Sequence, residues 1–150
     1  MLVNSSEVIS ERKITLIVFR SLFSKNKPPL TGAPAVRRLK TYSAQSGYVY
    51  QYYYEGHRPF RSKPDSGTEY VFSVSADAKQ WHPGSVMLGD AAVGEWERTN
   101  GRELSATERY AVAKLALFQA FDERSDPEQM KNEVRVRAAD VAGIVETLGL

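Results

Sequence analysis

Two histidines, His57 and His82, are the side chains best suited to proton transfer or metal binding in this sequence. A histidine titrates near neutral pH, and its neutral ring nitrogen is a common metal ligand. Either one could work with a carboxylate, and the candidates are Asp65, Asp77 and Asp90. No third ligand follows at the spacing of known metal motifs. We therefore interpret both histidines as loop residues and predict no metal site, no catalytic residue and no cofactor.

Motifs of several enzyme classes are absent from the sequence. The chain lacks the phosphate-binding G-x-x-x-x-G-K-[ST] loop, the dinucleotide-binding G-x-G-x-x-G turn, the zinc-binding H-E-x-x-H pair and the G-x-S-x-G elbow of hydrolases. An active site assembled from distant residues would leave no such motif. An enzyme therefore stays possible, but we favour a non-catalytic protein.

Basic side chains interleaved with aromatic rings suggest a second chemistry, the binding of an anion. The residues that we predict to bind a ligand are Arg37, Arg38, Lys40, Tyr53, His57, Arg58, Arg61 and Lys63. This mixture is typical of single-stranded nucleic-acid binding, and a phosphate-bearing small molecule or an acidic protein surface would suit it equally. Alternation along a strand splits the group, because Arg37 falls on one face while Arg38 and Lys40 fall on the other. A solvated sheet face without a ligand would carry the same residues.

The charge distribution is uneven although the formal net charge is only +2. Residues 1–68 hold 11 Lys and Arg against 4 Asp and Glu, which gives +7, and residues 69–150 hold 9 against 14, which gives −5. Such asymmetry hints at an anionic partner. Two halves of one fold can also neutralise each other, and we favour this simpler interpretation.

A run of tyrosines at residues 48–54 predicts the strand around which the fold is built. Aromatic residues suit a pleated, half-buried surface, and alternation places four tyrosines on one face while Tyr53 lies on the other. The tyrosine face is Tyr48, Tyr50, Tyr52 and Tyr54. Buried phenol hydroxyls need hydrogen-bond partners. We therefore expect either hydroxyls that reach the sheet margin or a pocket lined by tyrosines.

The other elements are predicted from periodicity and from helix-capping signals. Alternating apolar residues predict strands over 36–43, 69–75 and 85–88, and a short edge strand over 134–136. A polar loop is predicted over 57–67 because of its two prolines. Ser105 and Glu108 form a capping box at the start of a long helix. Further helices are predicted after Asp90, after Ser125 and near the C-terminus.

These elements predict one α+β domain over residues 36–150. An antiparallel sheet of about four strands packs one face against C-terminal helices, in two layers. Residues 1–35 are predicted to form an N-terminal arm and a Pro-rich linker. For residues 1–26, a buried strand and a basic amphipathic helix remain alternatives.

The composition limits the classes of protein to which this chain can belong. With 42% hydrophobic and 25% charged residues the chain suits a folded domain. The absence of cysteine excludes disulfides and thiolate sites, and it fits a cytoplasmic location. No apolar run approaches the ~20 residues of a transmembrane segment.

Three functional hypotheses follow from the sequence. The first is a binding module whose basic strand and loop surface faces an anionic ligand, a nucleic acid or an acidic protein surface. The second is a small-molecule binder or enzyme with a tyrosine-lined pocket that contains His57 or His82. The third is a structural module that forms a homo-oligomer through its sheet face or its arm.

Overall fold

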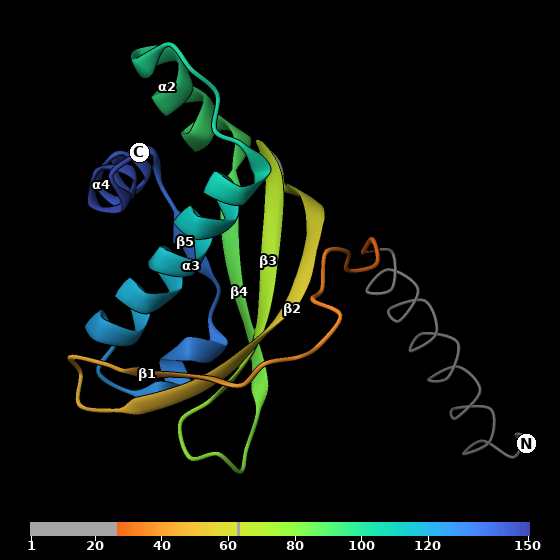
Figure 1. The fold of residues 1–150 in the computed structure, drawn as a ribbon, viewed down its shortest axis with the longest axis vertical. Coiled ribbons are helices and arrows are strands. Elements are labelled where there is room, and N and C mark those ends of the chain that lie inside the picture. Colours follow the sequence, from red (N-terminus) through yellow and green to blue (C-terminus); the bar gives the residue numbers. More distant parts are fainter. Residues whose placement is uncertain (1–26, 63) are drawn as a thin grey trace, which may run out of the picture.

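The computed structural model describes residues 27–62 and 64–150 (Figure 1). Predictions for residues 1–26 and for Lys63 lie outside this part of the chain. The elements in chain order are β1 (Lys40–Ser43), β2 (Val49–Ser62), β3 (Asp65–Ser75), β4 (His82–Gly89), α2 (Asp90–Asn100), α3 (Ala106–Glu123), the short 3-10 helix η1 (Pro127–Lys131), β5 (Val134–Val136) and α4 (Ala138–Leu148). No helix within these residues has the length and apolar character needed to cross a bilayer.

The sheet confirms the predicted α+β architecture. Its five strands lie in the order β1-β2-β3-β4-β5. The first four strands pair antiparallel with their neighbours, and β5 pairs parallel with β4 at the far edge. The chain between β4 and β5 forms helices α2 and α3, which supply the long crossover that a parallel pair requires.

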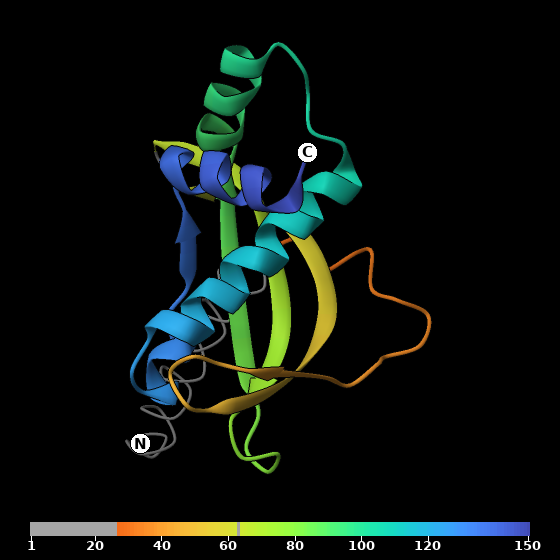
Figure 2. The ribbon, with the colours of Figure 1, turned by 60° about the vertical axis from the view of Figure 1, so that its left-hand side comes forward.

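Helix α3 covers one face of the curled sheet, as Figures 1 and 2 show. The predicted capping box is present: the Ser105 hydroxyl accepts from the Glu108 N–H, and the Glu108 carboxylate accepts from the Ser105 N–H. The C-terminal helix α4 packs against α2 and α3. The helices therefore form one layer and the sheet forms the other.

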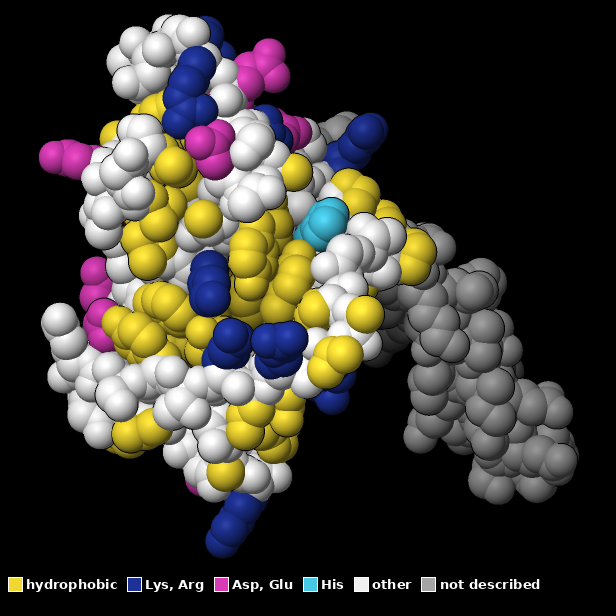
Figure 3. Space-filling model, viewed as in Figure 1, with side chains coloured by type: hydrophobic (Ala, Val, Ile, Leu, Met, Phe, Trp, Pro, Cys, Tyr) yellow, Lys and Arg dark blue, Asp and Glu magenta, His cyan; other side chains and the backbone are white. Residues whose placement is uncertain are grey.

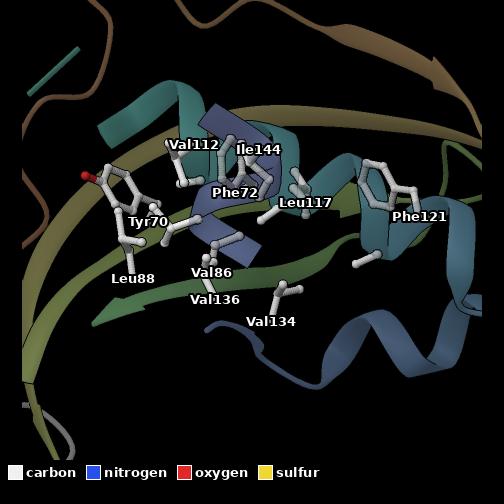
Figure 4. Close-up of a cluster of buried hydrophobic side chains, with 14 of the residues drawn as sticks. Tyr70, Phe72, Val86, Leu88, Val112, Leu117, Phe121, Val134, Val136 and Ile144 are labelled. Atoms are coloured by element: carbon white, nitrogen blue, oxygen red, sulfur yellow. The ribbon is translucent and has the colours of Figure 1, made fainter. Parts of the chain in front are cut away.

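The core fills the space between these two layers (Figure 4). Phe72, Val86 and Leu117 are fully or almost fully buried there, together with Ile144 of α4. The Tyr50 side chain is also completely buried, and its hydroxyl has no hydrogen-bond partner within the described residues. Such an unpaired group destabilises the fold, whereas stacking of the ring on Phe121 at 4.1 Å stabilises it.

The prediction of a loop over residues 57–67 is wrong, because residues 57–62 continue β2 and residues 65–67 begin β3. Their pairing runs from His57 opposite Tyr70 to Ser62 opposite Asp65. The loop was predicted because the segment contains two prolines, which are uncommon inside strands. Because β1 pairs with β2 only up to Tyr52, the rest of β2 lies towards the sheet edge, where a proline such as Pro59 is tolerated.

The predicted first strand is shorter than expected, because residues 32–39 leave the sheet edge and form a loop (Figure 2). Just before this loop, Thr31 pairs with His57 through two backbone hydrogen bonds of 2.8 Å. The loop is therefore attached to β2 at both of its ends. We refer to it as loop 32–39.

A bulge in β2 determines which side chains face α3. Tyr54 lies opposite Phe72, but Gly56 lies opposite Val71, so one extra residue is inserted on β2. This insertion puts His57 on the tyrosine face. Gly56 has φ +124°, and a Cβ there would lie 2.6 Å from the Thr31 carbonyl oxygen. Glycine is therefore required both by the backbone conformation and by the close approach of the chain.

We expect Gly56→Ala to lower the free energy of unfolding by about 3 kcal/mol, from a strained φ and a clash with the Thr31 carbonyl. Gly47 is a matched control, because its φ is +98° and a Cβ at that position would meet no atom within 4 Å. Gly47→Ala should cost only about 1 kcal/mol, from backbone strain alone. Urea unfolding measures both values. Equal losses would contradict the role of the contact with Thr31.

Candidate functional site

The candidate site is a pocket of about 540 Å³ between loop 32–39, the tyrosine face of the sheet and the start of α3. We call it the tyrosine pocket. Its lining residues are Gly32, Pro34, Val36, Arg38, Lys40, Tyr52, Tyr54, His57, Tyr70, Ala106, Thr107, Tyr110 and Lys114. Figure 3 shows this face, where hydrophobic side chains form a continuous area with Lys and Arg side chains across it.

The pocket exists because α3 fills only one end of the tyrosine face. Towards its C-terminus, Phe118 stacks on Tyr42 at 4.3 Å and lies edge-on to Tyr52 at 5.7 Å. At its N-terminus the helix presents the small residues Ala106 and Thr107. These short side chains line the pocket and fill less space than the phenylalanines at the other end of the helix.

Four tyrosines form the apolar walls of the pocket. The Tyr110 ring lies 4.7 Å from that of Tyr54 and 6.3 Å from that of Tyr70. Within the described residues, the hydroxyls of Tyr52, Tyr70 and Tyr110 have no protein hydrogen-bond partner, while Tyr54 has one. In Figure 4 the Tyr70 hydroxyl points away from the hydrophobic cluster. The pocket thus combines aromatic surface with hydroxyl groups that can bind a ligand.

His57 is held at the border of the pocket by protein contacts on both ring nitrogens. Its Nδ1 lies 3.1 Å from the Tyr54 hydroxyl, and its Nε2 lies 3.5 Å from the Thr31 hydroxyl. Gly32 packs against the ring, since a Cβ at that position would lie 2.6 Å from Cε1. His57 therefore connects loop 32–39 to the tyrosine face.

Burial keeps the phenols of the pocket in their neutral form. It raises the pKa of Tyr52 to about 12 from an ordinary value of 10.0. It also raises the pKa of Tyr54, Tyr70 and Tyr110, with neighbouring tyrosines adding to the effect at Tyr54. A neutral phenol donates a hydrogen bond, so the hydroxyls of Tyr52, Tyr70 and Tyr110 are available as donors at physiological pH, whereas that of Tyr54 already contacts His57.

Three cations line the same pocket: Arg38, Lys40 and Lys114. Within the described residues none of them forms an ion pair, and the lining contains no carboxylate. Burial, followed by the charge of Lys40, lowers the pKa of Lys114. Because both lysines line one pocket, their like charges repel each other.

The carboxylates around the pocket already have cationic partners elsewhere. Glu55 binds Arg37 on the opposite face of the sheet. On the helical side, Glu108 binds Arg102, and Glu97 binds Arg109 at 3.4 Å. The positive charge of the pocket is therefore not neutralised by these acidic residues.

The predicted ligand-binding residues are divided between the two faces of the sheet. Arg38, Lys40 and His57 meet in the tyrosine pocket. Arg37 lies on the other face, 2.6 Å from Glu55, with its guanidinium 4.2 Å from the centre of the Tyr53 ring.

Arg58 and Arg61 line a different groove, of about 990 Å³, which also contains His82. There the Arg58 guanidinium binds the buried Glu69 at 2.9 Å, and Glu69 also accepts from the Ser85 hydroxyl. These hydrogen bonds offset burial and lower the pKa of Glu69. Arg58 thus has a structural partner. Lys63 lies outside the described residues.

The sequence missed Tyr70, Tyr110 and Lys114 as pocket residues. Tyr70 and Tyr110 have the apolar spacing of core positions, and only the incomplete packing of α3 exposes them to a pocket. Lys114 is a charged residue of α3 and so does not belong to the apolar stripe of that helix. Lys114 could have been predicted as a pocket residue from its position on α3. It follows Tyr110 by one helical turn, which places the two side chains on the same face of the helix.

The described residues contain no group of histidine and acidic side chains able to hold a metal ion. Comparisons with protein-family models, with curated proteins and with solved structures find no match. Function is therefore inferred from the tyrosine pocket alone.

Alkaline pH tests the burial of the pocket phenols. With a pKa of about 12 in the folded state and 10.0 in the unfolded state, Tyr52 contributes stability below pH 10 that is lost as the pH rises to 12. We expect Tyr52→Phe to make the decline in unfolding free energy between pH 10 and 12 shallower than in the wild type. Urea unfolding at a series of pH values measures both slopes. Identical slopes would show that this hydroxyl is open to water.

Charge removal tests the repulsion inside the pocket. Lys114→Gln removes a partly buried charge next to Lys40, so we expect the melting temperature to rise by roughly 1 to 2 °C at low salt. Lys79→Gln removes the same charge from an exposed loop, next to Asp77, and should give no gain. Calorimetry measures both changes. A lower melting temperature for Lys114→Gln would mean that the lysine stabilises the fold.

Proposed function

We propose that this chain is a non-catalytic binding module whose tyrosine pocket takes an anionic small molecule with a flat apolar body. The observation that carries this proposal is the presence of three cations that have no carboxylate partner among the described residues and that line one aromatic pocket. Fixed positive charge that is not neutralised within the protein attracts an anion. Its position beside the tyrosines places the anion next to an apolar surface.

The shape of the pocket supports a small ligand. Small-molecule sites are commonly 300–1,000 Å³ in volume, mostly apolar, with a few polar groups, and the tyrosine pocket has about 540 Å³. Aromatic rings from Tyr54, Tyr70 and Tyr110 offer tilted faces to a planar group. We expect the body of the ligand to lie among these rings.

An extended polyanion is less well supported than a small anion. Two of the predicted basic residues, Arg37 and Arg58, already bind Glu55 and Glu69. A long nucleic-acid strand needs a continuous cationic track. Arg38, Lys40 and Lys114 instead meet around one pocket of limited volume.

Binding is favoured over catalysis because His57 is engaged. Both of its ring nitrogens face protein hydroxyls, at 3.1 and 3.5 Å. A general base must reach the proton that it removes, and the lining offers no carboxylate to replace the histidine.

The test uses two fluorescent probes that differ in charge. Anilinonaphthalene sulfonate carries a sulfonate on an aromatic body, and N-phenyl-1-naphthylamine has a similar body without the charge. We expect the sulfonate to bind more tightly, and Lys40→Gln or Lys114→Gln to weaken it about fivefold by removing an attractive charge. Fluorescence titration at low salt measures the affinities.

Lys79→Gln provides the matched control and should keep the wild-type affinity, because Lys79 lies outside the pocket. Near-ultraviolet circular dichroism confirms that each variant is folded, since anilinonaphthalene sulfonate also binds partly unfolded proteins. Equal affinity for the charged and the neutral probe would contradict the proposal.

A further inference from the structure

We infer that the anionic group of the ligand is a doubly charged phosphate monoester, held between Lys40, Lys114 and Arg38. This inference rests on the proposed function and narrows it from any anion to one class. The ligand would be an organic phosphate whose planar body lies among the tyrosines.

The three cations reach the pocket from both of its sides. Lys40 begins β1 and Arg38 precedes it on loop 32–39, so both come from the sheet edge. Lys114 comes from α3, which covers the sheet. A group bound between them is therefore contacted from two directions. Lys40 and Lys114 line the same pocket from these two sides, and burial followed by the charge of Lys40 lowers the pKa of Lys114.

The charge balance favours a dianion. Within the described residues the three cations have no acidic partner. A monoanion would leave two of the three positive charges without compensation, whereas a dianion leaves one. Above its second pKa of about 6, a phosphate monoester carries close to two negative charges.

The available donors also match phosphate. A phosphate monoester presents three acceptor oxygens. Arg38 can contact two of them with its guanidinium fork, and each lysine supplies further N–H donors. Tyr52 and Tyr110 line the same pocket, and their hydroxyls have no hydrogen-bond partner in the part of the chain that the structure describes and remain in the donating neutral form. A carboxylate, with only two oxygens, would leave more of these donors unused.

Loop 32–39 is suited to deliver Arg38 to the phosphate. On the opposite side of the sheet edge, Arg37 is fixed by Glu55 and by the Tyr53 ring. Adjacent residues of an extended segment point in opposite directions. The contact made by Arg37 therefore directs Arg38 towards the pocket, where it is among the lining residues.

The experiment compares three naphthalene ligands by calorimetry at pH 8 and low salt. 1-Naphthyl phosphate is a dianion, 1-naphthyl sulfate is a monoanion of the same shape, and 1-naphthol is neutral. We expect the phosphate to bind about tenfold more tightly than the sulfate, because the second charge lies among the cations. Inorganic phosphate should compete only weakly, because it lacks the apolar body.

The variants identify the groups responsible. Lys40→Gln and Lys114→Gln should each reduce the preference for phosphate over sulfate, whereas Lys79→Gln should retain it. Lys40 is exposed, so its replacement is not expected to disturb folding.

Each other outcome has a distinct meaning. Equal affinities for the phosphate and the sulfate, both above that of naphthol, would overturn the inference and leave the anion-binding function in place. No preference for either anion over naphthol would overturn the proposed function itself.

Discussion

The stacking of two α3 phenylalanines on tyrosines of the sheet is the interaction on which the rest of the structure depends. Phe121 lies on Tyr50 at 4.1 Å and Phe118 lies on Tyr42 at 4.3 Å, both with nearly parallel rings. The Tyr42 hydroxyl also donates to Asp122 at the end of the helix. These contacts fix one end of α3 close to the curled strands. The other end of the helix, which lacks such large side chains at Ala106 and Thr107, leaves the tyrosine pocket open.

The edge of β2 determines which side chains line this pocket. The extra residue at the bulge moves His57 onto the tyrosine face, and Thr31 binds the backbone of His57 from outside. Loop 32–39 then spans the gap to β1. Its two arginines lie on opposite faces of the sheet. Arg37 binds Glu55 on the far face, and Arg38 lines the pocket. One inserted residue and one attached loop thus convert a sheet margin into the wall of a site.

Alternation and capping made most of the fold predictable from the sequence, whereas the pocket depends on packing that no local pattern records. The burial of Tyr50 and Tyr52, the capping box at Ser105 and the edge strand at Val134–Val136 all follow from spacing, and the structure confirms them. Tyr48 was predicted on the same face, but it precedes β2 and is exposed. The continuation of β2 through Pro59 was missed because a proline is tolerated only where a strand lies at an edge. Lys114 was not predicted as a pocket residue, because the apolar spacing of α3 does not indicate where the helix stops covering the sheet.

The charges of the tyrosine pocket are arranged differently from those around Arg37, Arg58 and Arg124. Arg37 and Arg58 each have a glutamate at 2.6 to 2.9 Å, and Arg124 donates to backbone carbonyls near η1. By contrast, Arg38, Lys40 and Lys114 share one pocket without an acidic residue in its lining. Like charges that share a partly buried site destabilise the folded state when no ligand is bound. An anion that neutralises them binds only the folded state, so its affinity adds directly to the stability of the domain. The same cations that weaken the empty pocket would therefore stabilise the occupied one.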